Sequence, residues 1–246
     1  CPSHEQSTIT FKSKTSASLD LNEADPDRDF MIRYQLSEQK ILSGLLSHKG
    51  SEENTFLIQL EPPREIKPQD IPERDFIFVI DVSGSMKGFP LNLAKDLFRE
   101  LAQELRPEDR FNMLLFAGAN KVLSGKSLQA TDANVDRAIN FLNSSDGTGG
   151  TRLLNALEEA LELPHDHDHS RSLILISDGY IEAETEVFDL IKNKARGTNI
   201  FPLGVGSSVN RHLLEGLSHF TGRDHFIVTH SSESDTAVTR FKNIIS

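Results

Sequence analysis

The chain begins with segments in which apolar and polar residues alternate. The clearest is the segment 30–36, whose apolar positions are Phe30, Ile32, Tyr34 and Leu36. The alternation recurs at 56–60, and weaker versions occupy 19–21 and 41–46. A period of two residues is typical of a strand with one buried face and one face in water. Residues 1–61 are therefore predicted to be all-β.

After residue 75 the pattern changes to apolar runs separated by amphipathic segments. The runs, which have the length of buried strands, are 76–80, 111–116, 173–177, 200–205 and 226–228. Helical spacing of apolar residues predicts helices at 91–105, 135–142, 151–163, 184–196 and 213–217, and a last helix up to 245. This alternation predicts an α/β fold, a doubly wound and mostly parallel sheet with helices on both faces.

Prolines mark the boundary between these two regions. They punctuate a charged segment, which predicts a stiff linker, and they are Pro62, Pro63, Pro68 and Pro72. We therefore expect three parts: a small β module over residues 1–66, a linker over 67–75 and an α/β domain over 76–246.

Composition limits what the chain binds. It has 37 acidic residues against 26 Lys and Arg, a net charge of −11 at pH 7. This balance disfavours nucleic acid, because such binding relies on Lys and Arg at the phosphates. No apolar run approaches the roughly 20 residues that span a bilayer. The single Cys, at position 1, excludes an internal disulfide framework.

The first apolar run of the α/β region ends in oxygen-bearing side chains. Asp81, Ser83 and Ser85 follow the run 76–80 at alternate positions. A carboxylate and two hydroxyls on a tight turn suit a hard cation, because Mg²⁺ and Ca²⁺ prefer oxygen ligands and Mg²⁺ needs only one or two carboxylates beside its waters. In isolation, the same Asp-x-Ser-x-Ser pattern is also typical of a turn or a helix cap.

This segment resembles the start of the metal-ion-dependent adhesion site of the von Willebrand factor type A domain. In that family a Thr and an Asp from two later loops complete the site. The matching positions are Thr151, where a helical pattern opens, and Asp178, which follows the run 173–177. Ligands of parallel sheets lie at the carboxyl ends of strands, where Asp81 and Asp178 are expected. The resemblance covers about residues 75–246.

The resemblance implies a site for a divalent cation, expected to be Mg²⁺, with Mn²⁺ or Ca²⁺ as alternatives. Its ligands would be Asp81, Ser83, Ser85, Thr151 and Asp178. It also implies a non-enzymatic protein-binding or adhesion module, in which a Glu or Asp carboxylate of a protein partner completes the metal coordination. Tyr180 either contacts that partner or is a packing residue. The alternative is a structural or assembly module with a vestigial metal site.

Enzyme motifs are incomplete in this sequence. A phosphotransferase with an aspartyl nucleophile would want a second acid near Asp81, but position 83 is Ser. A nucleophile elbow needs glycines that flank the nucleophile as in Gly-x-Ser-x-Gly, and Ser85 lacks them. The run Gly125-Lys126-Ser127 lacks the earlier glycine of a P-loop. An unrecognised enzyme is therefore the least favoured class.

The β-rich start resembles the end of a VIT (vault protein/inter-alpha-trypsin) domain. The resemblance rests on the segments 27–34 and 71–76, and the earlier strands of such a domain are absent. VIT domains precede A domains in inter-alpha-trypsin inhibitor heavy chains and in bacterial cell-surface proteins. No basic-then-apolar leader opens the sequence. We therefore expect a trimmed piece of an extracellular or cell-surface protein, with a bacterial surface or periplasm favoured over a eukaryotic secreted protein.

Two smaller clusters each have a metal-binding and a structural interpretation. The segment 165–169 alternates His and Asp, which is compatible with a transition-metal site but is more typical of a solvated loop. The segment 25–29 carries Asp at alternate positions. It lacks the Gly and the final Glu of an EF-hand loop, so we interpret it as a turn.

Overall fold

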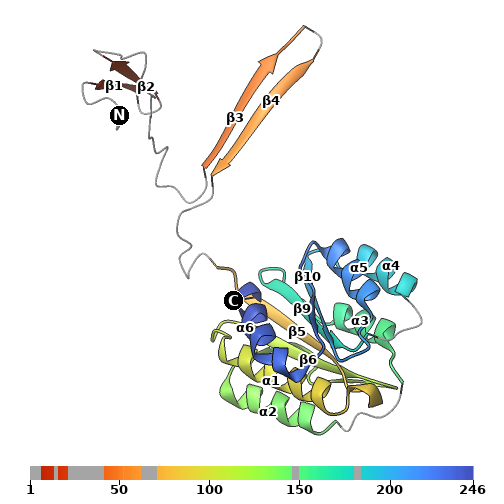
Figure 1. The fold of residues 1–246 in the computed structure, drawn as a ribbon. Coiled ribbons are helices and arrows are strands. Elements are labelled where there is room, and N and C mark those ends of the chain that lie inside the picture. Colours follow the sequence, from red (N-terminus) through yellow and green to blue (C-terminus); the bar gives the residue numbers. More distant parts are fainter. Residues whose placement is uncertain are drawn as a thin grey trace. The chain divides into compact units, whose positions relative to one another are not determined.

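The computed structural model of the chain describes residues 7–13, 16–21, 42–51, 53–61, 71–145, 150–179 and 184–245. The chain divides into two compact units, residues 1–70 and 71–246. Figure 1 shows the layered α/β fold of the second unit. The strand predicted at 30–36 and the turn predicted at 25–29 lie outside the described residues.

The second unit is built on a mostly parallel sheet. Its strands are β5 (Arg74–Asp81), β6 (Arg110–Phe116), β7 (Asn120–Val122), β8 (Leu128–Gln129), β9 (Ser170–Ser177), β10 (Thr198–Val205) and β11 (Phe226–Val228). The order across the sheet is β11-β10-β9-β5-β6-β7, with β8 paired to the start of β6. β7 and β8 run antiparallel to β6, and the other pairs are parallel.

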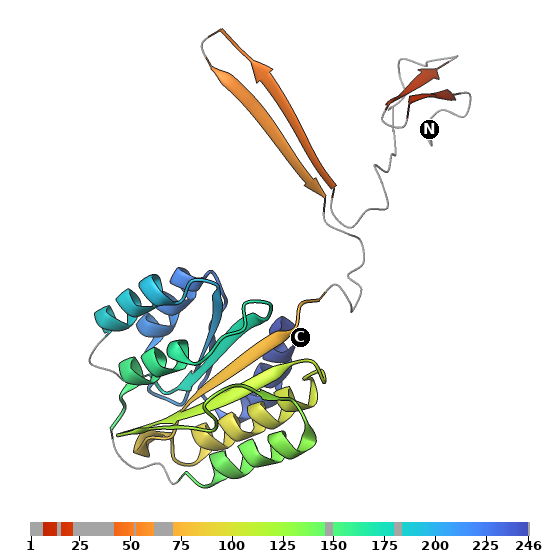
Figure 2. The ribbon, with the colours of Figure 1, turned by 180° about the vertical axis from the view of Figure 1, so that it is seen from behind.

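Helices cover both faces of this sheet, as predicted. They are α1 (Phe89–Gln103), α2 (Asp132–Asn143), α3 (Leu153–Glu162), α4 (Glu184–Lys194), α5 (Arg211–Thr221) and α6 (Ser234–Ile245), with 3-10 turns η2 (Gly84–Met86) and η3 (Ser231–Glu233). α1, α2 and α6 lie on one face, and α3, α4 and α5 lie on the other (Figures 1 and 2). The predicted doubly wound α/β fold is confirmed.

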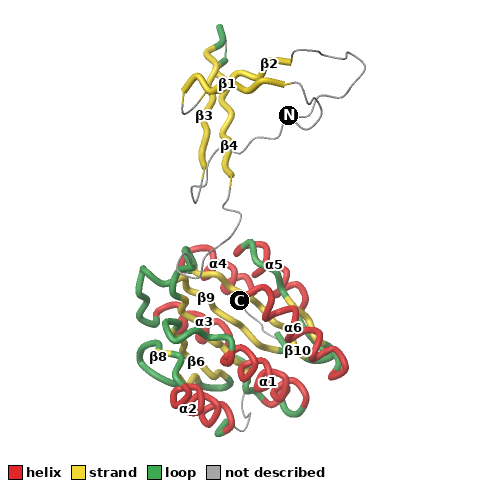
Figure 3. The backbone as a smooth tube through the Cα atoms, turned by 90° about the vertical axis from the view of Figure 1, so that its left-hand side faces the viewer, coloured by secondary structure: helices red, strands yellow, loops and turns green. Residues whose placement is uncertain are grey.

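The central strand β5 contributes to two separate cores. Phe76, Phe78 and Ile80 belong to the core beneath α1, α2 and α6. Ile77 and Val79 belong to the core beneath α3, α4 and α5. All five side chains are at most 3% exposed, and Figure 3 shows the strands enclosed between the helical layers. Burial on both faces explains why this strand is an uninterrupted apolar run.

β5 begins two residues before the predicted start of the domain. Arg74 and Asp75, which the sequence placed in the linker 67–75, both pair in register with β9, and Asp75 also pairs with β6. Charge pairing explains the extension: Arg74 lies 2.6 Å from a carboxylate oxygen of Asp109, and Asp75 lies 3.8 Å from Arg171. These partners are distant in sequence, so the hydrophobic pattern could not indicate them.

The described residues of the first unit form two antiparallel hairpins. They are β1 (Ser7–Ser13) with β2 (Ser16–Leu21), and β3 (Leu42–Lys49) with β4 (Asn54–Glu61). The predicted strands at 19–21 and 56–60 are confirmed, but the half-burial predicted for 56–60 is wrong. Phe56 is 72% exposed, and every described side chain of β3 and β4 is exposed. A two-stranded hairpin buries a face only when a further layer covers it.

Candidate metal centre

The carboxylate of Asp81 ends β5 and is fully buried. Its Oδ1 accepts a hydrogen bond from the backbone N–H of Ser83 at 2.8 Å. Its Oδ2 accepts one from the hydroxyl of Ser177, the last residue of β9, also at 2.8 Å. The Ser177 hydroxyl accepts in turn from the N–H of Gly179 at 2.9 Å. The ends of two neighbouring strands therefore hold the Asp81 carboxylate in one orientation.

Ser83 and Ser85 lie at the turn η2, directly after β5. Their hydroxyl oxygens are 3.1 Å apart. Ser83 is 2% exposed, whereas Ser85 is exposed. The fully buried side chain of Met86 anchors the turn in the core beneath α1. The turn therefore presents one interior and one solvent-facing hydroxyl next to Asp81.

Asp178 follows β9, the neighbour of β5 in the sheet. It is 8% exposed, and its Oδ1 is buried without a hydrogen-bond partner among the described residues. Gly206, at the end of β10, has a φ of +117°, and a Cβ there would lie 4.0 Å from the Cβ of Asp178. The positive φ favours glycine at this position, and the Asp178 carboxylate beside it retains an unused acceptor.

Thr151 is partly exposed and lies two residues before the first residue of α3. Because α3 returns the chain to the amino end of β9, its own start lies toward the carboxyl ends of the strands. The structure thus confirms that Thr151 lies near a helix N-terminus. Within the described part of the chain, no hydrogen bond joins Thr151 to Asp81, Ser83 or Ser85.

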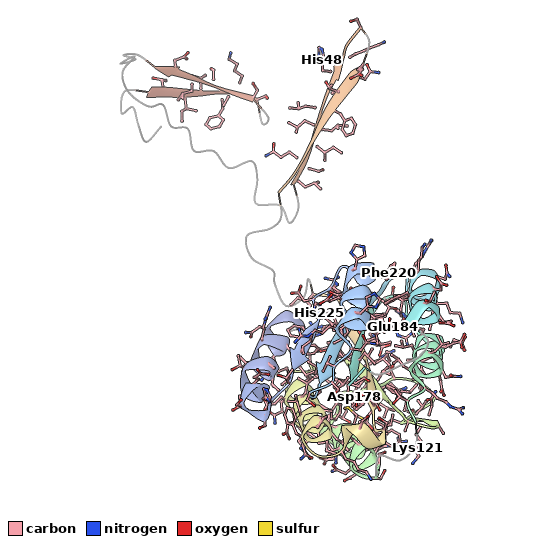
Figure 4. All side chains as sticks on the ribbon, turned by 45° about the vertical axis from the view of Figure 1, so that its right-hand side comes forward. His48, Lys121, Asp178, Glu184, Phe220 and His225 are labelled. Atoms are coloured by element: carbon pink, nitrogen blue, oxygen red, sulfur yellow. The ribbon has the colours of Figure 1, made fainter. Side chains whose placement is uncertain are left out.

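Asp81 and Asp178 lie at the point where the sheet topology changes direction. From β5 the chain continues through α1 to β6 on one side, and from β9 it continues through α4 to β10 on the other. Ligands of open α/β sheets bind in the crevice outside the carboxyl ends of the strands at such a switch point. Figure 4 labels Asp178 at this end of the sheet.

Burial and a neighbouring carboxylate raise the cost of ionising Asp81. Burial raises the pKa of Asp81, hydrogen bonds from Ser83 and Ser177 oppose that rise, and the charge of Asp178 adds to it. None of these hydrogen-bond donors carries a positive charge. A cation between the carboxylates would offset both the burial and the repulsion.

These residues fit a hard divalent cation. The unpartnered Oδ1 of Asp178 supplies an available acceptor, and the remaining donors are carboxylate and hydroxyl oxygens. Such a set, with one or two carboxylates and room for water, suits Mg²⁺ or Mn²⁺. It lacks the thiolate ligands that select softer metal ions.

The hydrogen bond from the Ser177 hydroxyl to Asp81 was not predicted from the sequence. Its only signal there was a serine at the end of a buried run. Tyr180, predicted to contact a partner or to pack, lies outside the described residues.

The segment 165–169 divides into an exposed middle and a buried end. Among the described residues, which include this whole segment, no group of three or more His, Cys, Asp or Glu side chains is arranged to hold a metal ion. His169 is buried and lies 2.9 Å from the carboxylate of Glu73, whereas His167 and Asp168 are exposed. The solvated-loop prediction is therefore correct for the middle of the segment and wrong for His169.

The sheet order, the helical cover and the carboxylates at the switch point define a doubly wound α/β domain with an oxygen-rich site at its strand ends. The profile of the von Willebrand factor type A domain matches residues 74–223, and the chain belongs to that family. Domains of this family typically serve in adhesion or protein interaction.

Curated relatives extend this similarity beyond the matched region. One von Willebrand factor A domain-containing protein of Dictyostelium discoideum is 30% identical over 184 residues, which is 73% of this chain and 20% of the relative. Another is 26% identical over 98% of this chain and 26% of its own length. Inter-alpha-trypsin inhibitor heavy chain H1 of Bos taurus is 27% identical over 77% of this chain and 21% of its length. The chain spans about a fifth to a quarter of these relatives.

Solved structures share the fold at low sequence identity. The von Willebrand factor type A protein from Catenulispora acidiphila has a TM-score of 0.63 at 15% identity, covering 86% of this chain and 50% of that one. The protein BatB from Bacteroides thetaiotaomicron has a TM-score of 0.56 at 20% identity, covering 70% of this chain and 98% of its own.

Proposed function

We propose that the chain is a non-enzymatic, divalent-metal-dependent protein-binding module. Asp81 supplies the main charge, Ser83, Ser85 and Thr151 supply hydroxyl oxygens, and Asp178 binds the ion directly or through water. Mg²⁺ is the expected ion, with Mn²⁺ or Ca²⁺ as alternatives. When bound, the ion acts as a Lewis acid for a carboxylate from outside the chain.

One observation carries this proposal. The Oδ1 of Asp178 is buried without a partner among the described residues, at the strand end next to the fully buried Asp81. A buried carboxylate oxygen without a partner costs folding free energy unless a cation or hydrogen bond compensates it. A bound divalent cation supplies that compensation, whereas a turn or helix cap leaves it unexplained.

The proposed partner is a protein that offers a Glu or Asp carboxylate. Three of the five proposed ligands are neutral hydroxyls, so the ion retains an affinity for an additional anionic ligand. The net charge of −11 disfavours the approach of an acidic partner, but this repulsion is screened beyond about 8 Å at physiological salt. Local shape around the ion must therefore provide the specificity.

The proposed setting is a cell surface or the extracellular space. One relative in Dictyostelium aligns with 98% of this chain, which supports the occurrence of the β part and the A domain together in one protein. We propose that the β part is VIT-like. None of the described helices combines the length and apolar character needed to cross a bilayer. The curated relatives described above are eukaryotic and two structural neighbours are bacterial, so a bacterial surface stays a prediction.

Calorimetric titration of the chain with Mg²⁺ and with Mn²⁺ tests the metal site. Wild type should release or absorb heat with a one-site isotherm, and Asp81→Ala should abolish it because the main charge is lost. Ser83→Ala should weaken binding less, since it removes a neutral ligand. Equal isotherms for wild type and Asp81→Ala would exclude the site. If the ion keeps an open position, added acetate should bind to the metal-loaded protein and not to the metal-free protein.

A second candidate function is assembly through the β part with a vestigial metal site. The observation that favours it is the apolar face of the β3–β4 hairpin, on which Leu45, Phe56, Ile58 and Leu60 are all more than half exposed. Sedimentation with and without EDTA separates the two functions. Self-association that is unchanged by EDTA, together with the absence of metal binding in calorimetry, would support assembly alone.

A further inference from the structure

Asn210 joins three elements beside the proposed ligand Asp178. Its backbone N–H donates to the carbonyl of Asp178 at 3.3 Å. Its side-chain Oδ1 accepts from the N–H of Leu213 at 3.1 Å and caps α5. Its Nδ2 donates to Oε1 of Glu184, the first residue of α4. The backbone and the side chain of one residue together therefore connect the end of β9 with the starts of α4 and α5.

The backbone after Asp178 lies directly against Asn210. Gly179 has a φ of +79°, and a Cβ at this position would lie 3.1 Å from the Cβ of Asn210 and 3.2 Å from its nitrogen. Both the positive φ and the short approach require glycine here. The position of Asn210 and the path of the chain beyond Asp178 are therefore mutually dependent.

Glu184 is held from α5 by a second residue. Nδ1 of His212 lies 2.8 Å from Oε2 of Glu184, so both carboxylate oxygens have a partner. Figure 4 labels Glu184 at the start of α4 and Asp178 at the end of β9. The Glu184 carboxylate is thereby fixed as the acceptor that orients the Asn210 amide.

We propose that Asn210 is a positioning residue of the metal site. It fixes the backbone of Asp178 relative to α4 and α5, so that the Asp178 carboxylate keeps the orientation needed for the ion. This inference rests on the proposed metal-dependent function. The competing interpretation is that Asn210 serves only as the N-cap of α5, in which case any residue that caps equally well would leave the ion unaffected.

Asn210→Asp separates these two roles in the full chain. Asp caps helices about as well as Asn, and the backbone N–H remains, but the donor to Glu184 is lost and two carboxylates now face each other. The added negative charge by itself would strengthen cation binding. We expect the opposite, an affinity for Mn²⁺ weakened about tenfold in calorimetry, because partners that orient ligands typically contribute 10- to 100-fold.

A double variant tests whether the hydrogen bond itself is responsible. In Asn210→Asp with Glu184→Gln, the donor and acceptor are exchanged and the net charge equals that of wild type. The glutamine amide donates to Asp at position 210, and its oxygen still accepts from His212. Mn²⁺ affinity should return to within about twofold of wild type, since the restored pair removes the coupling penalty.

Thr131→Asp is the matched control. Thr131 caps α2 by accepting from the N–H of Asn134, and it follows β8, which pairs with the start of β6 at the opposite end of the strands. The substitution adds the same charge at another cap. Its Mn²⁺ affinity should stay within about twofold of wild type, because charges beyond a Debye length are largely screened.

A metal-free measurement checks the same contact. Hydrogen exchange is followed at the backbone N–H of residue 210, which donates to the carbonyl of Asp178. Its protection factor should fall in Asn210→Asp and should rise again in the double variant. If Asn210→Asp does not fold, Glu184→Ala removes the acceptor at a helix start and should also weaken Mn²⁺ binding.

The outcomes separate this inference from the function on which it rests. A folded Asn210→Asp or Glu184→Ala that binds Mn²⁺ like wild type, while wild type shows a one-site isotherm, overturns the positioning role alone. An equal loss in Thr131→Asp also overturns it. A wild-type chain that binds neither Mn²⁺ nor Mg²⁺ overturns the metal site, and the positioning role with it.

Discussion

The two ends of the central sheet hold buried carboxylates in opposite situations. At the amino end, Asp109 accepts hydrogen bonds from the guanidinium groups of Arg74 and Arg106, one of them at 2.6 Å. At the carboxyl end, Asp81 accepts only from neutral donors, and Oδ1 of Asp178 has no partner among the described residues. Both ends bury acids, but among the described residues only the acids at the amino end, Asp109 and Asp75, lie beside arginines.

The pKa values of the two ends shift in opposite directions. Burial by itself would raise the pKa of Asp109, but the hydrogen bonds from Arg74 and Arg106 outweigh it, and the pKa lies below its ordinary value. Burial raises the pKa of Asp81 above its ordinary value. A carboxylate paired by the chain itself therefore stabilises the fold, whereas one left for an external cation costs stability until that cation binds.

The largest expected effect is at the amino end. Asp109→Asn should lower the free energy of unfolding by about 3 kcal/mol, because it removes the charged acceptor for two arginines at a fully buried position. Denaturant unfolding measures the loss. The control is Asp96→Asn, which breaks an exposed pair with Arg99 and should cost less than about 1 kcal/mol. Equal losses in both variants would contradict the comparison.

The acid stability of the protein should depend on the same residue. Because the folded pKa of Asp109 is lowered, its contribution is fully present above the ordinary value of about 4 and is lost as the pH falls through the folded pKa. The stability difference between wild type and Asp109→Asn should therefore shrink from about pH 5 to about pH 3. A difference that stays constant over this range would assign the stability to packing instead of charge.

At the carboxyl end the sign of the effect reverses. In the metal-free protein, Asp81→Asn should raise the free energy of unfolding by about 1 kcal/mol, since a neutral amide replaces a buried charge beside Asp178. Saturating Mg²⁺ should stabilise wild type by mass action and leave Asp81→Asn unchanged. A metal-free Asp81→Asn that is as destabilised as Asp109→Asn would remove the distinction between the two ends.

The smallest expected effect comes from removal of the first unit. A chain that begins at Ile71 retains both ends of the sheet and both cores, so it should melt cooperatively with a stability within about 1 kcal/mol of the full chain. Thermal melting followed by circular dichroism measures this. A molten product would show that residues 1–70 contribute to the core of the α/β unit.

The central strands and the polar residues at their ends were predictable because their signals are local. Burial on both faces leaves uninterrupted apolar runs before Asp81 and Asp178, and the motif follows directly in sequence. Asn210 was not predictable, because its partners Asp178 and Glu184 come close only after α5 packs on the sheet. β7 and β8 are too short to show the alternation of apolar and polar residues that indicates a strand. The exposure of Phe56 depends on whether another layer covers its hairpin, which alternation alone does not encode.

The path of β5 has a mechanical consequence. The chain enters the α/β unit at the amino end of this strand, where Arg106 donates to the carbonyl of Pro72 at 2.8 Å, and Asp81 lies at its other end. β5 pairs in parallel with a strand on each side. A pull between residue 71 and a partner held at the carboxyl end would therefore run along this strand. It would load both ladders of hydrogen bonds in shear, so that they resist together instead of opening one at a time.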